Sequence, residues 1–449
     1  MTILRSPRLE TLLGGAIPTQ GAIEYHHLEL LSSGQIGEAE DLEYKRELYG
    51  NGDSQRRELC KDVAALANTR GGLLVVGIQE NDQGRAIALS DVSLSDAEAT
   101  RMHQTIGSGV HPLPTFEIIP VENPATPGAG CYVIVVAAGP RQPYAVAVND
   151  GYRYPRRIGM TIGYLTEPEI ETAYRRRDSV RRDQAARAHE VEEAIIRRLP
   201  TDRPWVMVSL VPDQPGDARL DATSFSKART SYQSANPMVV GRDLSWRRVL
   251  LGQRRLILDD QYDFNQRTPR NLAAEVHNDG SGAFACPSAF RADSEAEVWP
   301  FNDELLVNLI MSGLRFLAEH ARERTHAAGS AMLRVTVAPG HGHKPWGLFH
   351  DGDGWGPEAV GNQAVHLDFR PAEAAASLEE LVDGPGLVSA AAILGSEIFQ
   401  GFGLPEVPQI TQLGQIRQRH WSLRDWKPAI LTWAKEHGVE VIDEIVATR

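Results

Sequence analysis

Acidic side chains form two groups in the N-terminal third of the chain, Glu38 with Glu43 and Glu80 with Asp82. Carboxylate oxygens are the ligands that Mg²⁺ and Mn²⁺ prefer, and such an ion can polarise a phosphodiester and activate water. Lys45 shares a strand face with Glu43 and could hold the phosphate. We therefore expect a phosphodiester-cleaving site in which all four acids are catalytic and Glu38, Glu43 and Glu80 hold the metal ion.

The spacing of the first two acids sets a condition on this site. Glu38 and Glu43 are five residues apart, and an odd spacing in one continuous strand puts side chains on opposite faces. The chain must therefore bend between them, and Gly37 directly before Glu38 would permit a bend. The alternative is an ordinary solvated face, because the chain has 59 acidic residues and carboxylates are usually exposed.

A basic segment further along the chain is a candidate nucleic-acid contact. Arg153, Arg156 and Arg157 lie on or just after an expected hairpin, next to aromatic residues such as Tyr152. Arginine suits phosphate contacts and an aromatic ring can stack on a base, so we expect these four residues to bind nucleic acid together with the lysine above. The arginine-rich stretch at 175–182 could extend this surface, or could be a solvated, salt-bridged helix.

A glycine-rich segment in the C-terminal half contains other possible metal ligands. These are three histidines and two aspartates: His341, His343, His350, Asp351 and Asp353. Imidazole and carboxylate groups can bind zinc, but this spacing matches no standard zinc pattern and the segment could be a plain polar loop. The sequence contains no Gly-x-x-x-x-Gly-Lys-Ser/Thr loop for ATP and no local signature of a serine or cysteine nucleophile.

The bulk composition fits two or three globular domains, since the chain has 449 residues and is 42% hydrophobic. The net charge of −13 opposes nucleic-acid binding, so any basic residues that bind must be gathered in a patch. Cys60, Cys131 and Cys286 are far apart and form no metal-type pair. Such a cysteine pattern is typical of reduced thiols, so we expect a cytoplasmic protein. Because there is no long apolar run, we expect no membrane partner.

A strand, a helix and a second strand are expected to position the acidic groups. Residues 41–45 alternate between apolar and charged side chains, which indicates a half-buried strand. A cap at Asp53 or Ser54 would begin an amphipathic helix. The double glycine at 71–72 is expected to end this helix and to turn the chain into a buried apolar strand at 73–78.

The remainder of the N-terminal region is expected to add strands and one long helix. Strands are predicted at 116–121 and 132–137, followed by a hairpin of strands 144–148 and 152–155 that turns at Asn149-Asp150-Gly151. Thr166-Glu-Pro-Glu169 is a capping box with proline in the first turn, and it predicts a helix to about Arg198. This helix is the natural domain boundary.

The C-terminal half is expected to be a second, mixed α+β domain of unrecognised type. Strands are predicted at 205–211 and 333–337, with two more between 246 and 259. Helices are predicted at 302–324, over most of 374–400, and once or twice within 423–446.

The motifs of the N-terminal region resemble the AlbA_2 domain of the Schlafen family. The family pattern is a glutamate, four residues and Glu-aromatic-Lys, then a helix ending Ala-hydrophobic-Ala-Asn-Thr-x-Gly-Gly, then an apolar strand ending Gly-Val/Ile before acidic residues. The matching segments are Glu38, Glu43-Tyr44-Lys45, the run 65–72 and Gly77-Ile78-Gln79-Glu80. The resemblance implies an α+β fold, with a mixed sheet packed against helices.

The resemblance also sets the expected domain boundaries. It covers about residues 36–177, after a helical lead-in at 1–35. A helical linker at 178–200 and a C-terminal α+β domain at 201–449 are expected to follow.

The resemblance implies a function as well. Nuclease members of the Schlafen family use two glutamates and an aspartate as a metal-dependent endoribonuclease centre that cuts tRNA or related RNA. Glu38 and Glu43 have the matching spacing, but Gln79 stands where the family has aspartate, so Glu80 or Asp82 would have to supply the third acid. The expected cofactor is Mg²⁺ or Mn²⁺, and the expected partner is RNA rather than DNA.

By the same resemblance, the protein could act in stress or phage defence, and it could form a homodimer, because Schlafen cores pair two such lobes around RNA. The alternative is a non-catalytic DNA-binding or transcription-regulatory module whose C-terminal domain senses a ligand or binds a partner protein. The departure at Gln79 and the acidic net charge favour that alternative.

Overall fold

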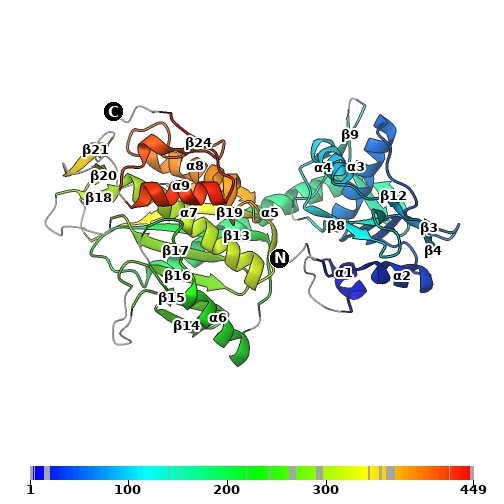
Figure 1. The fold of residues 1–449 in the computed structure, drawn as a ribbon, viewed down its shortest axis with the longest axis horizontal. Coiled ribbons are helices and arrows are strands. Elements are labelled where there is room, and N and C mark those ends of the chain that lie inside the picture. Colours follow the sequence, from blue (N-terminus) through cyan, green and yellow to red (C-terminus); the bar gives the residue numbers. More distant parts are fainter. Residues whose placement is uncertain are drawn as a thin grey trace. The chain divides into compact units, whose positions relative to one another are not determined.

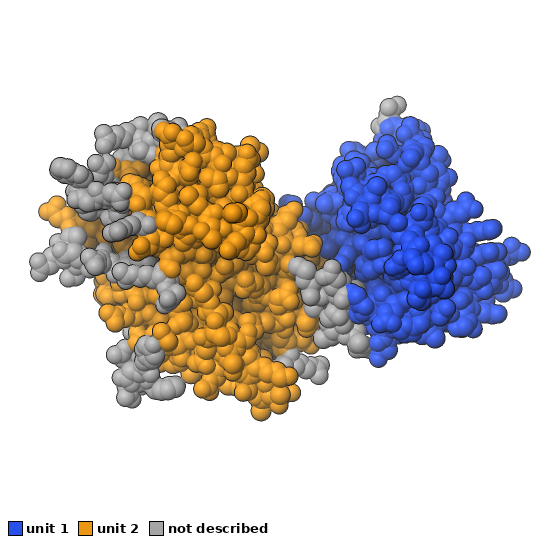
Figure 2. All heavy atoms as spheres, viewed as in Figure 1, with its two compact units in different colours: residues 1–182 blue, residues 183–449 orange. Residues whose placement is uncertain are grey.

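The structure, a computed structural model, describes residues 4, 6–14, 21–139, 141–149, 151–218, 220–241, 244–261, 269–289, 297–341, 344–352, 356–360, 370–423 and 425–444. The chain divides into two compact units, residues 1–182 and residues 183–449, which are drawn in Figures 1 and 2. Both units combine helices with sheets, which confirms the predicted α+β class. No helix within the described ranges has both the length and the apolar character needed to cross a membrane.

Within the described residues, a five-stranded mixed sheet forms the centre of the N-terminal unit. Its strands are β1 (Leu42–Lys45), β2 (Gly71–Val76), β5 (Val92–Ser93), β7 (Phe116–Glu122) and β8 (Ala129–Ala137). β1 runs parallel to β2, and the other pairings are antiparallel. Every residue of β2 is buried, as expected for a central strand covered on both faces.

Two helices cover this sheet, α3 (Asp53–Ala67) and α4 (Asp96–Gly109). They share one core cluster with the sheet, which includes Leu59, Val63, Leu66, Leu74, Met102, Ile106, Ile134 and Val136. The first turns of α3 are exposed, whereas its later turns are buried. Two short helices, α1 (Pro7–Leu12) and α2 (Tyr25–Ser33), precede the sheet, as the sequence predicts for the lead-in.

Short antiparallel pairings border the central sheet. They join β3 (Ile78–Glu80) with β4 (Ala86–Leu89), β9 (Ala145–Val148) with both β6 (Val110–His111) and β10 (Gly151–Arg153), and β11 (Pro155–Ile158) with β12 (Thr161–Tyr164). The β9–β10 pairing confirms the predicted hairpin; Asp150 of its turn lies outside the described residues.

The double glycine has a different role from the predicted one. α3 ends at Ala67 with Asn68 as its cap, so the helix stops before either glycine. Gly71 and Gly72 instead begin β2, with φ angles of 70° and 141°. A Cβ atom on Gly72 would lie 2.2 Å from the backbone oxygen of Asp41. Glycine is therefore needed here so that the start of β2 can approach the chain beside β1.

Two further predictions about this region were wrong. The cap of α3 is Gly52, and Asp53 is the first helical residue, where its negative charge favours the helix dipole. The apolar strand predicted at 73–78 is interrupted at Gly77, which has a φ angle of 106°. Because of this interruption, Ile78 begins β3, and β3 carries Glu80 into a separate hairpin.

A long helix, α5 (Glu167–Ile196), runs from the first unit into the second. The backbone N–H and the hydroxyl of Thr166 both donate to the Glu169 carboxylate at 2.8 Å. These bonds form the predicted start of the helix. Near its C-terminal end, α5 buries Val191 and Ile195 against the sheet of the second unit.

That sheet has seven strands among the described residues, all antiparallel. Their order is β14 (Arg248–Gly252), β15 (Arg255–Asp259), β16 (Ala273–His277), β17 (Gly282–Pro287), β13 (Trp205–Gln214), β19 (Ala328–Ala338) and β22 (Ala372–Ser377). Alternate residues of β13 enter two cores, with Val206 and Val208 on one face and Trp205 and Met207 against α5. The sheet is therefore covered on both faces.

Helices and short strands complete the second unit. The helices are α6 (Ala222–Ser234), α7 (Asp303–Glu319), α8 (Gly384–Gln400) and α9 (Trp426–Glu436), with a π-helical turn at His320–Arg324 and a 3₁₀ turn at Gln418–His420. The short strands are β18 (Trp299–Asn302), β20 (Trp346–Gly352), β21 (Gly356–Val360), β23 (Ile416–Arg417) and β24 (Val441–Ile442).

The helix predictions for the C-terminal half need two corrections. Residues 374–377 belong to β22, and the helix predicted over most of 374–400 begins only at Gly384. Pairing with β19 overrides the helix propensity of the alanines there. The predicted helical tail contains α9 but continues into β24.

Candidate functional site

Glu43 is the centre of a buried network of charged side chains. It lies on β1 with 6% of its surface exposed, and its carboxylate forms ion pairs with Lys45 and Arg157. Lys45 Nζ also lies 3.4 Å from Asp62 Oδ2 on α3, and the Tyr49 hydroxyl donates to the same oxygen at 2.7 Å. Lys45 and Arg157 thus balance the two carboxylates, as the burial of charge requires.

Burial governs the titration of this network. It raises the pKa of Asp62, while Lys45 acts in the opposite direction. It lowers the pKa of Arg157, while nearby carboxylates, Glu38 first among them, oppose the shift. Asp62 and Arg157 therefore depend on oppositely charged neighbours to offset the cost of their burial.

The Asn-Thr pair after α3 positions Arg157. Asn68 Nδ2 donates to the backbone oxygens of Tyr144 and Pro155 at 2.8 Å each, and Asn68 Oδ1 accepts from the Tyr144 N–H at 2.8 Å. Thr69 Oγ1 accepts from the Arg157 N–H at 2.9 Å. These contacts tie the starts of β9 and β11 to the end of α3, and they bring the Arg157 side chain to β1.

Glu38 and Glu80 form the second part of the acidic cluster. Glu38 Oε1 accepts from the Tyr44 N–H at 3.0 Å, so the chain bends back after Glu38 as the spacing of the acids requires. Burial is the largest cause of a raised pKa at Glu80, and the charge of Glu38 is the next, while Lys45 opposes both. Glu38 is therefore close enough to Glu80 to influence the ionisation of Glu80.

The predicted metal ligands fit a divalent ion only in part. In the described structure, Glu38, Glu43 and Glu80 do not bring one oxygen each to within 4.8 Å of one another. The charge of Glu43 is already balanced by its two cationic partners. Glu38 and Glu80 remain as carboxylates that could hold Mg²⁺ or Mn²⁺. Asp82 is exposed in the turn between β3 and β4.

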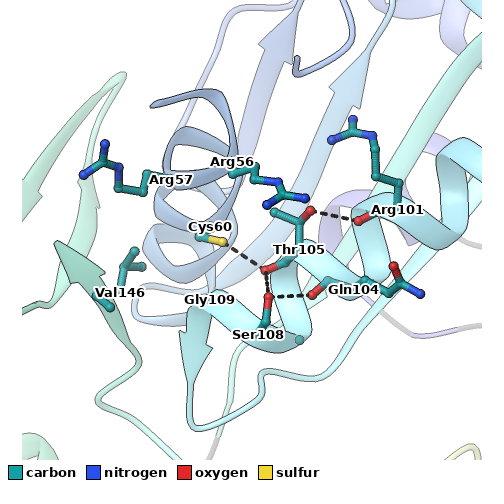
Figure 3. A pocket seen from close by; sticks show the side chains of 11 residues that line it. Arg56, Arg57, Cys60, Arg101, Gln104, Thr105, Ser108, Gly109 and Val146 are labelled. Atoms are coloured by element: carbon teal, nitrogen blue, oxygen red, sulfur yellow. Dashed lines mark hydrogen bonds between the residues drawn. The ribbon is translucent and has the colours of Figure 1, made fainter. Parts of the chain in front are cut away.

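A pocket of about 660 Å³ opens between α3, α4 and β9. Arg56 and Arg57 line it from α3, and Arg101 lines it from α4 (Figure 3). Figure 3 shows Arg56 directed towards α4, and Arg57 extended from α3 on the side where β9 carries Val146. Burial raises the pKa of the Cys60 thiol at the pocket wall to about 11, so this thiol is not ionised at neutral pH. Three guanidinium groups make the pocket suitable for an anion such as phosphate.

A second pocket, of about 310 Å³, adjoins the first and shares Arg57 and Val146 with it. Lys61 and Arg153 add two cations to its lining, Glu58 adds one carboxylate, and Tyr164 adds an aromatic ring. We call the two pockets together the basic groove, and its cations are Arg56, Arg57, Lys61, Arg101 and Arg153.

The cations of the basic groove differ in their availability. Arg56, Arg57 and Arg153 are exposed, and none of them pairs with a carboxylate in the part of the chain that the structure describes. Arg101 pairs with Glu98 on its own helix. Lys61 Nζ lies 3.9 Å from a carboxylate oxygen of its neighbour Asp62, which connects the groove to the network around Glu43.

Of the four residues predicted for the basic segment, only Arg153 lines the groove. Tyr152 is on the surface and 60% exposed. Arg156 forms an ion pair with Glu169 at 2.5 Å, in which both side chains are about a third exposed, and Arg157 is buried with Glu43.

Sequence reasoning missed the other cations of the groove. Arg57 and Lys61 are four residues apart on a predicted helix, which puts them on one face and is a signal that was available. Arg101 gives no such signal, because the helix at 96–109 is not among the predicted elements.

The histidine-rich segment of the C-terminal half is only partly described. His341 is exposed, and His350 lies on β20 rather than in a loop. His343, Asp353 and the side chain of Asp351 lie outside the described residues.

Comparison with known proteins identifies one region of the chain. A model of the family described as Schlafen, AlbA_2 matches residues 38–165. No curated protein matches the chain. A crystal structure of the DIP2311 protein from Corynebacterium diphtheriae is 18% identical, over 50% of this chain and 37% of that one, with a TM-score of 0.21. The match thus spans little more than a third of the solved chain. With a TM-score this low, we infer neither fold nor function from it.

Proposed function

Because residues 38–165 form a Schlafen AlbA_2 domain, we propose that this protein binds nucleic acid, with RNA preferred over DNA, in the basic groove. The observation that carries this proposal is a set of three exposed arginines around two joined pockets, Arg56, Arg57 and Arg153, with no acidic partner among the described residues. The whole chain has a net charge of −13. A polyanion would therefore bind where positive charge is locally concentrated.

The groove combines the two kinds of contact that single-stranded RNA uses. Arg56 and Arg57 offer planar guanidinium groups, which suit two-point contacts to phosphate oxygens. Tyr164 lines the same groove and is 51% exposed, so its ring is available to stack on an unpaired base. Unpaired bases are more accessible in RNA loops than in duplex DNA, which favours RNA.

Lys45 and Arg157 have different roles in this proposal from those expected from sequence. Arg157 is buried against Glu43, so it positions the acidic cluster instead of contacting phosphate. Lys45 lies between Glu43 and Asp62, so a phosphate would compete with two carboxylates for it.

A second candidate function is cleavage of the bound RNA, and the closeness of Glu38 and Glu80 favours it. Their carboxylates would hold Mg²⁺ or Mn²⁺, which would polarise a phosphodiester and activate water. Burial and the charge of Glu38 raise the pKa of Glu80, which favours a proton-transfer role for this carboxyl. We propose tRNA or another structured RNA as the substrate, in stress or phage defence, with a homodimer or a partner protein on the C-terminal unit completing the binding surface.

One assay tests both functions. Full-length protein is incubated with total tRNA and with duplex DNA of similar length, in Mg²⁺, Mn²⁺ or EDTA, beside the variants Glu80→Gln and Arg57→Ala. We expect salt-sensitive RNA binding in EDTA that Glu80→Gln retains and Arg57→Ala weakens. With metal we expect discrete RNA fragments, formed at least about 100-fold more slowly by Glu80→Gln.

The other outcomes separate the alternatives. RNA binding without fragments in any metal would remove cleavage and leave the binding function. Tighter binding to duplex DNA than to RNA would favour the transcription-regulatory alternative. Absence of any binding at low salt would contradict the proposal.

A further inference from the structure

The C-terminal unit contains a separate group of side chains with metal-binding chemistry. Asp303 and Glu304 are the first residues of α7, and His350 lies on β20. One nitrogen or oxygen from each lies within 4.8 Å of the other two. His350 Nδ1 is 2.9 Å from Asp303 Oδ2 and 3.9 Å from Glu304 Oε1. Ligand atoms around a tetrahedral zinc ion are about 3.4 Å apart, so the spacing already suits an ion.

The two carboxylates of this group are buried without a strong cation beside them. Asp303 is 3% exposed and Glu304 is 0% exposed. Among the described residues, His350 is the only basic side chain within ion-pair distance of either. A single imidazole balances at most one charge, and burial of unbalanced carboxylates is costly. A divalent cation would balance both.

An unpartnered polar atom belongs to the same place. Gln409 is 0% exposed, and its Nε2 donates to Asp303 Oδ2 at 2.7 Å, which holds the amide against the group. Its Oε1 is buried and has no hydrogen-bond partner in the described part of the structure. Amide oxygens are metal ligands, so Gln409 offers a neutral donor beside the two carboxylates.

The chain that follows Gln409 supports the group from outside. The backbone N–H and the hydroxyl of Ser422 each donate to Glu304 Oε1 at 2.7 Å. Hydrogen bonds of this kind fix the orientation of ligating carboxylates.

We propose that Asp303, Glu304 and His350 bind a divalent transition-metal ion of the zinc or manganese class, with Gln409 beside them. One imidazole with two carboxylates is a mixed nitrogen and oxygen donor set, which suits these ions better than Mg²⁺. The ion would join the start of α7, β20 and the segment that carries Gln409, so it would stabilise the C-terminal unit. This site does not depend on the basic groove or on the acids of the N-terminal unit.

The test measures retained metal. Full-length protein is stripped with EDTA, equilibrated with Zn²⁺ or Mn²⁺ and desalted, and its metal content is measured by mass spectrometry together with its Tm. We expect wild-type protein to retain one equivalent that raises Tm, and His350→Gln to lose both. The control His341→Gln, which changes an exposed histidine of the same unit, should retain both. The variant Glu80→Gln shows whether any retained ion belongs to the N-terminal cluster instead.

A second variant keeps the test decisive if His350→Gln does not fold. Asp303→Asn keeps the shape of the side chain but removes its charge, and it should also lose the retained equivalent. Unchanged metal content in a folded variant of either residue would overturn the proposal. So would wild-type protein that retains no metal after stripping and reloading, or a retained ion that only Glu80→Gln removes.

Discussion

Replacing Arg157 with methionine is expected to lower the free energy of unfolding of the N-terminal unit by about 3 kcal/mol. The Arg157 side chain is 1% exposed, and that of its partner Glu43 is 8% exposed. Methionine fills much of the same volume, so the main cost is a buried carboxylate that has lost a partner. Lys45 continues to pair with Glu43, which keeps the cost at the lower end of values for broken buried pairs.

Hydrogen exchange can measure this effect in the full chain. All eight tryptophans lie after residue 204, so tryptophan fluorescence reports only on the C-terminal unit. Amide exchange in β2 and β8 reports on the opening of the N-terminal unit. We expect exchange there to become about 150-fold faster in Arg157→Met, because each 1.4 kcal/mol is a factor of about ten, while the fluorescence stays unchanged.

The neighbouring arginine provides a matched control. Arg156 is paired with Glu169, and both side chains are about a third exposed, so Arg156→Met should cost less than about 1 kcal/mol. The double variant Glu43→Gln/Arg157→Met should be more stable than Arg157→Met, because it removes the stranded charge. Equal exchange in the wild-type protein and Arg157→Met would refute the structural role assigned to this ion pair.

Replacing Arg56 and Arg57 together with alanine is expected to weaken binding of single-stranded RNA about 25-fold in 0.1 M salt. The plot of log affinity against log salt has a negative slope, and each lost phosphate contact makes this slope shallower by about 0.7. Loss of two contacts therefore makes it shallower by about 1.4. Both side chains are exposed on the first turns of α3, so the fold should be unaffected. Fluorescence anisotropy of labelled RNA, over a series of salt concentrations, gives both the affinity and the slope.

The control for this variant removes the same charge elsewhere in the unit. Arg70 and Arg175 have side chains that are 79% and 77% exposed, and neither lines the groove. Arg70→Ala/Arg175→Ala should change the salt slope by less than about 0.5. If this double variant weakened RNA binding as much as the groove variant, the binding would follow the overall charge and not the groove.

The local structure around the acidic cluster was predictable because its signals are local. The apolar spacing of residues 59–67 predicts α3, and the alternation at 41–45 predicts β1. The five-residue spacing of Glu38 and Glu43 correctly requires a bend. The interruption at Gly77 could not be predicted from the sequence pattern. A continuous apolar run predicts one uninterrupted strand, and the backbone angle that breaks it is visible only in the structure.

The partners of the charged side chains could not be read from the sequence. From the sequence, Arg157 is predicted to be an exposed phosphate ligand, because charged residues are usually solvated. Its partner Glu43 is 114 residues away in the chain, so nothing local indicates the ion pair. Asp62 lies on the buried face of α3 only because Lys45 and Tyr49 reach it from another segment. The basic groove is likewise formed by two helices and several short strands, and its lining becomes visible only when they are packed together.

The measurement that tests RNA binding in the groove most directly uses Gly107 on α4, which lines the first pocket. A Cβ atom there would meet nothing within 4 Å, so Gly107→Glu and Gly107→Gln can both be accommodated and differ only in charge. We expect Gly107→Glu to weaken RNA binding about fivefold, through roughly 1 kcal/mol of repulsion between the carboxylate and phosphate. Gly107→Gln should bind within about twofold of the wild-type protein. Equal RNA affinities for the two variants would contradict the assignment of the groove as the RNA-binding site.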